Sequence, residues 1–310
     1  MGKNEQRVVS HDKRKKIAKD ILPYLLIAPT LLLIFVILFF PVFKVFSLSL
    51  QDFSFTRPES MGKPVFFENF YTIFFGDLVF PSALFITLKW VFYEVGLQLV
   101  FGLIVALLMN QTFKGRGLAR SMVFIPWAVS GVLTTMLWSL MYNQHVGLIN
   151  DILIRMGLIK EGVAWLANPN SVFNSVILAE LWRGIPFFAV TILAALQGIP
   201  REVYESSDID GCGGFRRLIY IILPYLKQTI VFSTLLRVIW EFNSIDMIFT
   251  MTNGGPMRLT TTLPIYMMQT AIIGGDYGYG SALAVMVFII LILFSLFYLK
   301  ISNYGGEIDE

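Results

Sequence analysis

Three long apolar stretches without a single charged residue most constrain how this chain can fold. They cover residues 21–43, 121–142 and 281–299 and run for 23, 22 and 19 residues. A helix of about 20 apolar residues crosses the ~30 Å hydrocarbon core of a bilayer. Charged residues make up only 15% of the 310, against about 25% in a typical soluble domain, so lipid is the expected surrounding.

Three further apolar stretches, each holding a few charged residues, lie at 81–109, 172–198 and 228–251. Charges inside a span are costly and mark pairs or pathways. The sequence therefore predicts an all-α, polytopic integral membrane protein with six transmembrane helices. Their expected bounds are 21–43, 81–109, 121–142, 172–198, 228–251 and 281–299.

The lysine and arginine residues between these stretches predict how the chain is oriented. With the N-terminus inside, the cytoplasmic segments hold fifteen basic residues and the outer loops hold six. Basic residues are enriched on the cytoplasmic side, so both termini are expected there. The tail 1–20 is then a cytoplasmic topology anchor near anionic lipid, not a nucleic-acid-binding segment. Residues 21–310 form the permease domain, and the first helix is expected to stay uncleaved.

Several chemistries are not indicated by the composition. Cys212 is the one cysteine, and the two histidines, His11 and His145, lie far apart, so neither a disulfide nor a metal site is expected. No G-x-x-x-x-G-K-[ST] sequence is present to hold phosphates. The chain is therefore not expected to be an enzyme or to carry a cofactor, and energy for any transport must come from another subunit.

The segment 198–224, between the fourth and fifth expected spans, predicts a short helix outside the bilayer. Pro200 suits the first turn of a helix, and Glu202 and Glu205 lie where the helix dipole favours carboxylates. Gly211 can end the helix in a left-handed conformation. A helix of two to three turns held between two spans can transmit movement to both spans from a soluble partner that binds it.

The spacing of this segment resembles the EAA loop of ATP-binding-cassette (ABC) importer permeases. It reads Glu205-Ser-Ser, three residues, Gly211, nine residues, Ile221, one residue, then Leu223-Pro224. Two small serines, Ser206 and Ser207, stand where that family usually has alanines. The resemblance implies that this is the coupling helix that docks in a groove of the ATPase subunit. The residues given that role are Glu205, Ser206, Ser207 and Gly211; an ordinary amphipathic connector is the alternative.

Further motifs are similar to the sugar-importer branch of that family, which includes the maltose and glycerol-3-phosphate importer permeases. They are Phe124-Ile-Pro-Trp127, Trp182-Arg-Gly-Ile-Pro186 and Thr252-Asn-Gly-Gly-Pro256. The resemblance implies an ABC type I importer permease fold in the inner or plasma membrane of a prokaryote. The implied partners are a second permease, two ATPase subunits that bind ATP and Mg, a solute-binding protein, and a sugar.

The last of these motifs is a glycine turn at the expected outer mouth. Family resemblance places it near the docked solute-binding protein, and a turn without a ligand role is the alternative. The residues concerned are Asn253, Gly254, Gly255 and Pro256.

Two stripes of charged and aromatic residues are candidates for the substrate pathway. Each follows i, i+3, i+4, i+7 spacing, which places its members on one helix face. Carboxylates and guanidinium groups suit sugar hydroxyls, and an aromatic ring suits the C–H face. The resemblance agrees, because the maltose permease contacts sugar from the same two helices. The stripes are Glu180, Arg183, Gly184 and Phe187 in one span, and Arg237, Trp240, Glu241 and Ser244 in the next.

Other readings of these residues stay open. The Glu–Arg pairs could simply neutralise each other and hold helices together. Asn243 and Asp246 are expected to face away from the stripe, and Glu94 is expected to find its partner on another helix. The substrate could be a glycerol phosphate, with Arg183 and Arg237 as phosphate partners. Two alternative functions are an ion-coupled secondary transporter and a non-transporting membrane sensor or scaffold.

Overall fold

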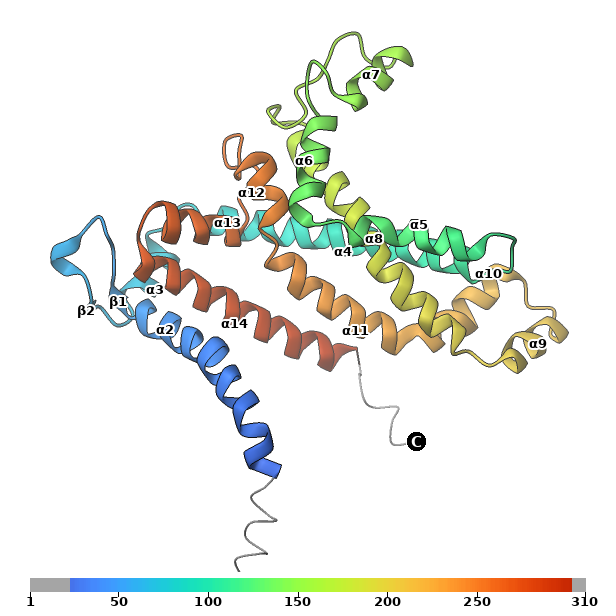
Figure 1. Ribbon diagram of the computed structural model, residues 1–310, viewed down its shortest axis with the longest axis horizontal. Coiled ribbons are helices and arrows are strands. Elements are labelled where there is room, and N and C mark those ends of the chain that lie inside the picture. The colour runs from blue at the N-terminus through green and yellow to red at the C-terminus, as the bar shows by residue number, and fades with distance from the viewer. Residues whose placement is uncertain (1–22, 303–310) are drawn as a thin grey trace, which may run out of the picture.

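Five long apolar helices form the body of the protein. The computed structural model describes residues 23–302, and in that range these helices are long and apolar enough to cross a membrane (Figure 1). The expected tail 1–20 lies outside the described residues. The five are Pro23–Ser49, which includes α2 (Phe40–Ser49); α4 (Phe80–Asn110); α8 (Val172–Gln197); Gly214–Thr252, which includes α10 (Gly214–Arg217), η3 (Leu218–Ile222), α11 (Leu223–Phe242) and α12 (Asp246–Thr252); and α14 (Tyr277–Ile301).

The third expected span, 121–142, is not one straight helix. It is split between α5 (Arg116–Ala128) and α6 (Gly131–Met141), whose axes differ by 92°. Pro126 removes a backbone donor near the end of α5, and Val129 and Ser130 then leave the helical conformation, both with ψ of 137°. The charge-free run 121–142 gave no sign of the bend, and the two helices together begin at Arg116, before that run.

The core of the protein lies between α4 and α8, which run side by side. Gly102 allows their close approach, because a Cβ atom built there would lie 2.4 Å from the Cβ atom of Phe188. Phe188 and Ile192 on α8 are fully buried, as is Trp90 farther along α4. Small residues commonly let helix backbones approach in membranes, where packing rather than water exclusion drives association.

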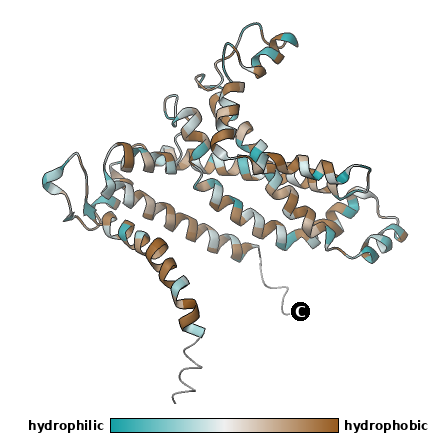
Figure 2. Cartoon of the chain, in the orientation of Figure 1, coloured by the Kyte–Doolittle hydropathy of each residue, from teal (hydrophilic) through white to brown (hydrophobic). Residues whose placement is uncertain are grey.

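The outer surfaces of the long helices are apolar. Figure 2 shows hydrophobic residues along α14 and the first helix, with hydrophilic residues gathered at α9 (Arg201–Ile209), at α7 (Leu148–Arg155) and at the small hairpin near α3 (Glu68–Phe75). The most apolar window of Pro23–Ser49 has no buried residue at all. Such surfaces are compatible with lipid and not with water.

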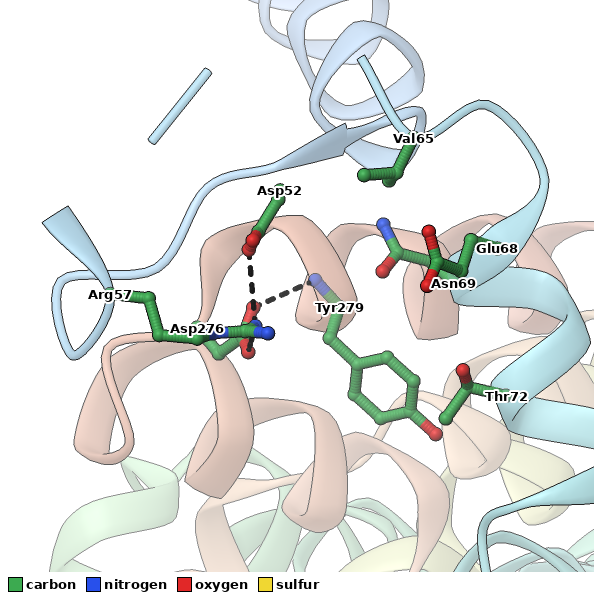
Figure 3. A pocket seen from close by; sticks show the side chains of 8 residues that line it. All are labelled: Asp52, Arg57, Val65, Glu68, Asn69, Thr72, Asp276 and Tyr279. Atoms are coloured by element: carbon green, nitrogen blue, oxygen red, sulfur yellow. Dashed lines mark hydrogen bonds and ion pairs between the residues drawn. The ribbon is translucent and has the colours of Figure 1, made fainter. Parts of the chain in front are cut away.

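One end of the bundle carries short elements, including a two-stranded hairpin that is a minor exception to the all-α prediction. Strands β1 (Gln51–Asp52) and β2 (Lys63–Pro64) pair antiparallel, with Asp52 opposite Lys63. Arg57 ties this hairpin to the start of α14 by ion pairs to Asp52 and Asp276 at 3.1 and 2.9 Å (Figure 3). Close by lie η2 (Pro58–Ser60), α3, α13 (Leu263–Met268) and η4 (Gln269–Ile273).

Asp77 joins the starts of three helices at this same end. Its Oδ1 atom accepts hydrogen bonds from the backbone N–H groups of Val79 and Phe80, and its Oδ2 atom accepts from the hydroxyls of Tyr266 and Tyr279 at 2.7 and 2.6 Å. Burial disfavours the charged carboxylate, but these donors outweigh it and hold the pKa of Asp77 below its usual value.

Candidate substrate cavity and coupling helix

The two predicted stripes meet in one buried ion network. On α8, Arg183 binds Glu180 with two hydrogen bonds, of 2.8 and 3.1 Å. On α11, the Nη2 atom of Arg237 lies 2.6 Å from the Oε1 atom of Glu241. Arg237 also reaches Glu180 across the helix boundary, at 3.3 Å. The acid–guanidinium pairs therefore exist within each stripe and between the two.

A third helix, α4, completes the network, and the sequence analysis missed its contribution. Trp90 Nε1 donates to Glu241, and Gln98 Nε2 donates to both Glu241 and Glu94. The partner of Glu94 thus lies on its own helix, contrary to expectation. Trp90, Glu94 and Gln98 are spaced i, i+4, i+8, which places them on one face, and this spacing was the available signal.

A cavity of about 410 Å³ opens beside this network. Glu180, Arg237 and Glu241 form its back and are almost fully buried. Trp240, by contrast, is 47% exposed, and the side chain of Arg183 is 24% exposed. The remaining lining residues are Ile239, Asn243, Ser244, Ile245 and Asp246.

Two predicted pathway residues do not line this cavity. Gly184 is buried, and a Cβ atom built on it would lie 2.3 Å from the side chain of Gln98 and 2.5 Å from Arg237. Phe187 packs against Trp240, with ring centroids 5.2 Å apart, and also lies beneath the guanidinium of Arg237. Gly184 provides space and Phe187 provides support, so neither presents a polar group to a ligand.

Asn243 and Asp246 line the cavity, although they were expected to face away from it. The expectation assumed an unbroken helix, but α11 ends at Phe242 and α12 begins at Asp246. The bend between α5 and α6 lies at the same place. A Cβ atom on Gly131 would be 3.1 Å from Arg183 and 3.5 Å from Asp246. Two breaks in long helices thus meet at the mouth of the cavity.

The segment 198–224 forms the short helix that was expected. Helix α9 runs from Arg201 to Ile209 after Pro200, and Gly211 ends it with a φ of +68°. Glu205 and Ser206 are exposed, whereas Ser207 is buried and donates to the carbonyl of Tyr204. An ion pair between Asp208 and Arg217 holds α9 against the next helix.

The glycine turn 252–256 is a tight loop that follows α12. Asn253 and Gly254 have φ angles of +48° and +84°. The hydroxyls of Thr260 and Thr261 hold the loop through the carbonyls of Gly255 and Gly254. Asn253 is exposed and Gly254 is buried, while Gly255 and Pro256 are half-buried.

These features define a polytopic membrane permease: apolar spans, a polar cavity between broken helices, and a short polar helix between two of the spans. The chain belongs to the family of binding-protein-dependent transport system inner membrane components, which it matches over residues 98–303. It is therefore a non-catalytic, multi-pass inner-membrane subunit of a prokaryotic ABC importer, as the sequence predicted.

Similar proteins of this family cover nearly the whole chain. The trehalose/maltose transport system permease protein MalF of Thermococcus litoralis is 36% identical over 92% of this chain and 95% of its own length. The sulfoquinovosyl glycerol transport system permease protein SmoG of Agrobacterium fabrum is 36% identical over 91% of this chain and 90% of its own length. The arabinooligosaccharides transport system permease protein AraP of Bacillus subtilis is 27% identical over 94% and 91%.

The fold is also that of a solved importer. The structure of a bacterial ABC transporter involved in the import of the acidic polysaccharide alginate aligns with a TM-score of 0.82 at 22% identity, covering 96% of this chain and 100% of that one. A second structure, of the alginate transporter with a pentasaccharide-bound periplasmic protein, aligns with a TM-score of 0.81 at 21% identity and covers 94% and 98%. The predicted ABC importer permease fold is confirmed.

Proposed function

We propose that this permease carries a sugar through the cavity between α8 and α11. The observation that supports it best is the combination of groups facing that cavity. Trp240 offers an exposed ring to the C–H face of a sugar, while Asn243, Ser244 and Asp246 offer hydrogen-bonding groups to its hydroxyls. The similar permeases are named for maltose, trehalose and arabinooligosaccharides, in agreement with this substrate class.

The pairing of the guanidinium groups favours a sugar over a glycerol phosphate. Both Arg183 and Arg237 are already bound to carboxylates, and Arg237 is buried behind the cavity. A phosphate would have to displace these carboxylates before it could gain a bidentate partner. A hydroxyl-rich neutral ligand needs no such displacement.

We further propose that α9 couples this chain to separate ATPase subunits that bind ATP and Mg. Its exposed face carries Glu205 and Ser206, and Ile209 is 87% exposed at its end. This exposed face, with acidic, small and apolar side chains side by side, is the surface that we assign to the ATPase contact. Ser207 is buried within this helix, whereas Gly211 is exposed where the helix ends.

The other proposed partners are a second permease and a solute-binding protein. The turn at Asn253, Gly254, Gly255 and Pro256 is the proposed contact with the solute-binding protein, at the opposite end of the chain's spans from α9. The segments on the side of α9 and the termini hold fifteen basic residues and the loops on the other side hold six, which supports a cytoplasmic α9 and cytoplasmic termini.

The test is sugar uptake by the complete transporter. A strain without this permease, supplied with the wild-type chain, should take up at least one sugar from a panel of sugars and glycerol phosphates, and uptake should depend on ATP. Uptake of a glycerol phosphate alone would contradict the sugar proposal. Uptake that follows the proton gradient without ATPase subunits would contradict the coupling proposal.

A further inference from the structure

Gln98 is a fully buried amide at the centre of the charged network, on a helix that does not line the cavity. Its Oε1 atom accepts a hydrogen bond of 2.6 Å from Nε of Arg237. Its Nε2 atom donates to Glu94 at 2.8 Å and to Glu241 at 3.1 Å. One side chain thus contacts a cation from one side and two carboxylates from the other.

The chemistry of the neighbours fixes which way this amide points. Nε of Arg237 can only donate, so it must face the amide oxygen of Gln98. An amide turned by 180° would set a donor against a donor and an acceptor against an acceptor. A carboxylate in its place could still bind Arg237, but it would put an acceptor against Glu94 and Glu241.

The surroundings of Gln98 leave it no other position. Gly184 on α8 packs against both Gln98 and Arg237, so that even a methyl group there would overlap them. Trp90, one helical turn before Glu94, holds the second oxygen of Glu241 at 3.1 Å. Arg237 and Glu241 are therefore anchored from behind, on the side away from the cavity.

We propose that Gln98 is a positioning residue for the cavity. It holds Arg237 and Glu241 in the wall, so that the groups left facing a ligand are the ring of Trp240, the polar residues beside it and the paired Arg183. The cavity then suits uncharged, hydroxyl-rich ligands, because both of its guanidinium groups are already paired with Glu180 or Glu241. This inference rests on the proposed sugar pathway and adds to it how the pathway is kept in shape.

Exchanging the amide of Gln98 with the carboxylate of Glu94 tests this role. Gln98→Glu keeps the shape but removes the donor, and Gln98→Met keeps the approximate volume but removes both polar atoms. We expect each to lower sugar uptake per assembled transporter about tenfold. Glu94→Gln together with Gln98→Glu restores one amide beside one carboxylate and keeps an acceptor for Arg237. This double variant removes the clash at position 94 but leaves the one with Glu241, so uptake should recover only in part, about threefold above that of Gln98→Glu.

The measurements are uptake in vesicles, the amount of assembled transporter, and its ATP hydrolysis. The positioning role predicts normal assembly and hydrolysis with reduced uptake, relieved by the swap. If Gln98→Glu does not assemble, a swapped variant that assembles and transports supports the role equally. Wild-type uptake by Gln98→Met, or a swap that performs no better than Gln98→Glu, would overturn it.

These outcomes are separate from those of the proposed function. Trp240→Ala tests whether the cavity carries the sugar, and it leaves the hydrogen bonds of Gln98 in place. Normal uptake by Trp240→Ala, combined with rescue by the swap, would remove the sugar pathway and keep the network as a requirement for transport. Reduced uptake by Trp240→Ala, without rescue, would keep the pathway and remove the role of Gln98.

Discussion

Gly184 and Gln98 touch across the boundary between α8 and α4, and a Cβ atom on Gly184 would lie 2.3 Å from the amide carbon of Gln98. Both residues are buried, and the same Cβ atom would lie 2.5 Å from the Nη2 atom of Arg237. The charged network therefore depends on a position that bears no side chain. The sequence analysis placed Gly184 on the substrate stripe, but what the structure shows there is room for two other side chains.

Gly184→Ala should accordingly reduce both stability and transport. Overpacking of a tight core costs about 1–3 kcal/mol, and here the neighbours that must move are the amide and the guanidinium of the network. We expect a lower thermal midpoint of the detergent-solubilised protein and reduced uptake per molecule. Gly117→Ala is the matched control, because a Cβ atom there meets nothing within 4 Å. Equal midpoints for the two variants would show that the network tolerates displacement.

Trp240→Ala should impair sugar uptake more than it impairs expression. The ring is 47% exposed at the cavity, so its loss removes a platform for the substrate and little buried core. A loss of about tenfold in uptake corresponds to about 1.4 kcal/mol. Trp127→Ala is the control, since Trp127 is 46% exposed on α5 and lies outside the cavity lining. If both variants lose expression alone, packing accounts for Trp240.

Glu205→Lys should uncouple ATP hydrolysis from uptake while the chain still inserts in the membrane. Glu205 is exposed on α9, and reversing its charge alters a docking surface without disturbing a buried contact. The readout is the amount of ATPase subunit that copurifies with the permease. Glu161→Lys makes the same charge change on an exposed residue far from α9 and should retain the ATPase. Full retention by Glu205→Lys would argue against α9 as the coupling helix.

Asp77→Asn should lower stability at neutral pH by about 1–3 kcal/mol, because the ionised carboxylate accepts four hydrogen bonds from two backbone N–H groups and two tyrosines. Hydrogen bonds hold the folded pKa of Asp77 below its ordinary value of 3.8. Its contribution is therefore present above that ordinary value and is lost as the pH falls through the lower, folded pKa.

The measurement is thermal unfolding of wild type and Asp77→Asn across a pH series. The difference in thermal midpoint between the two proteins should be constant from pH 5 to 8 and should shrink below about pH 4, because the carboxylate is then protonated. Asp151→Asn is the control, since its exposed pair with Arg155 contributes little. A difference that grows toward acid pH would contradict the sign predicted here.

The parts of this protein that sequence predicted well are those set by local chemistry. Helix α9 was found because Pro200 precedes it and Gly211 ends it, and both act through their own backbone. The apolar spans were found because bilayer thickness fixes their length. The resemblance of the segment 198–224 then supplied the family, which no periodicity could have given.

The parts that were missed depend on contacts between helices. Glu94 and Gln98 belong to the network only because α4 packs on α8 and α11, and one sequence does not reveal which helices are neighbours. The breaks at Ser130 and after Phe242 also escaped, since apolar content is the same on either side of a bend. Asn243 and Asp246 were misplaced for that reason.

The contact between Gly102 and Phe188 has a mechanical consequence. Helix α8 leads directly into α9, with only Gly198 to Pro200 between them. Because α4 and α8 interlock at van der Waals distance, they cannot slide past one another without unpacking. A force applied at α9 should thus shift both helices together as one rigid body, and the cavity wall formed by α8 would tilt intact instead of coming apart.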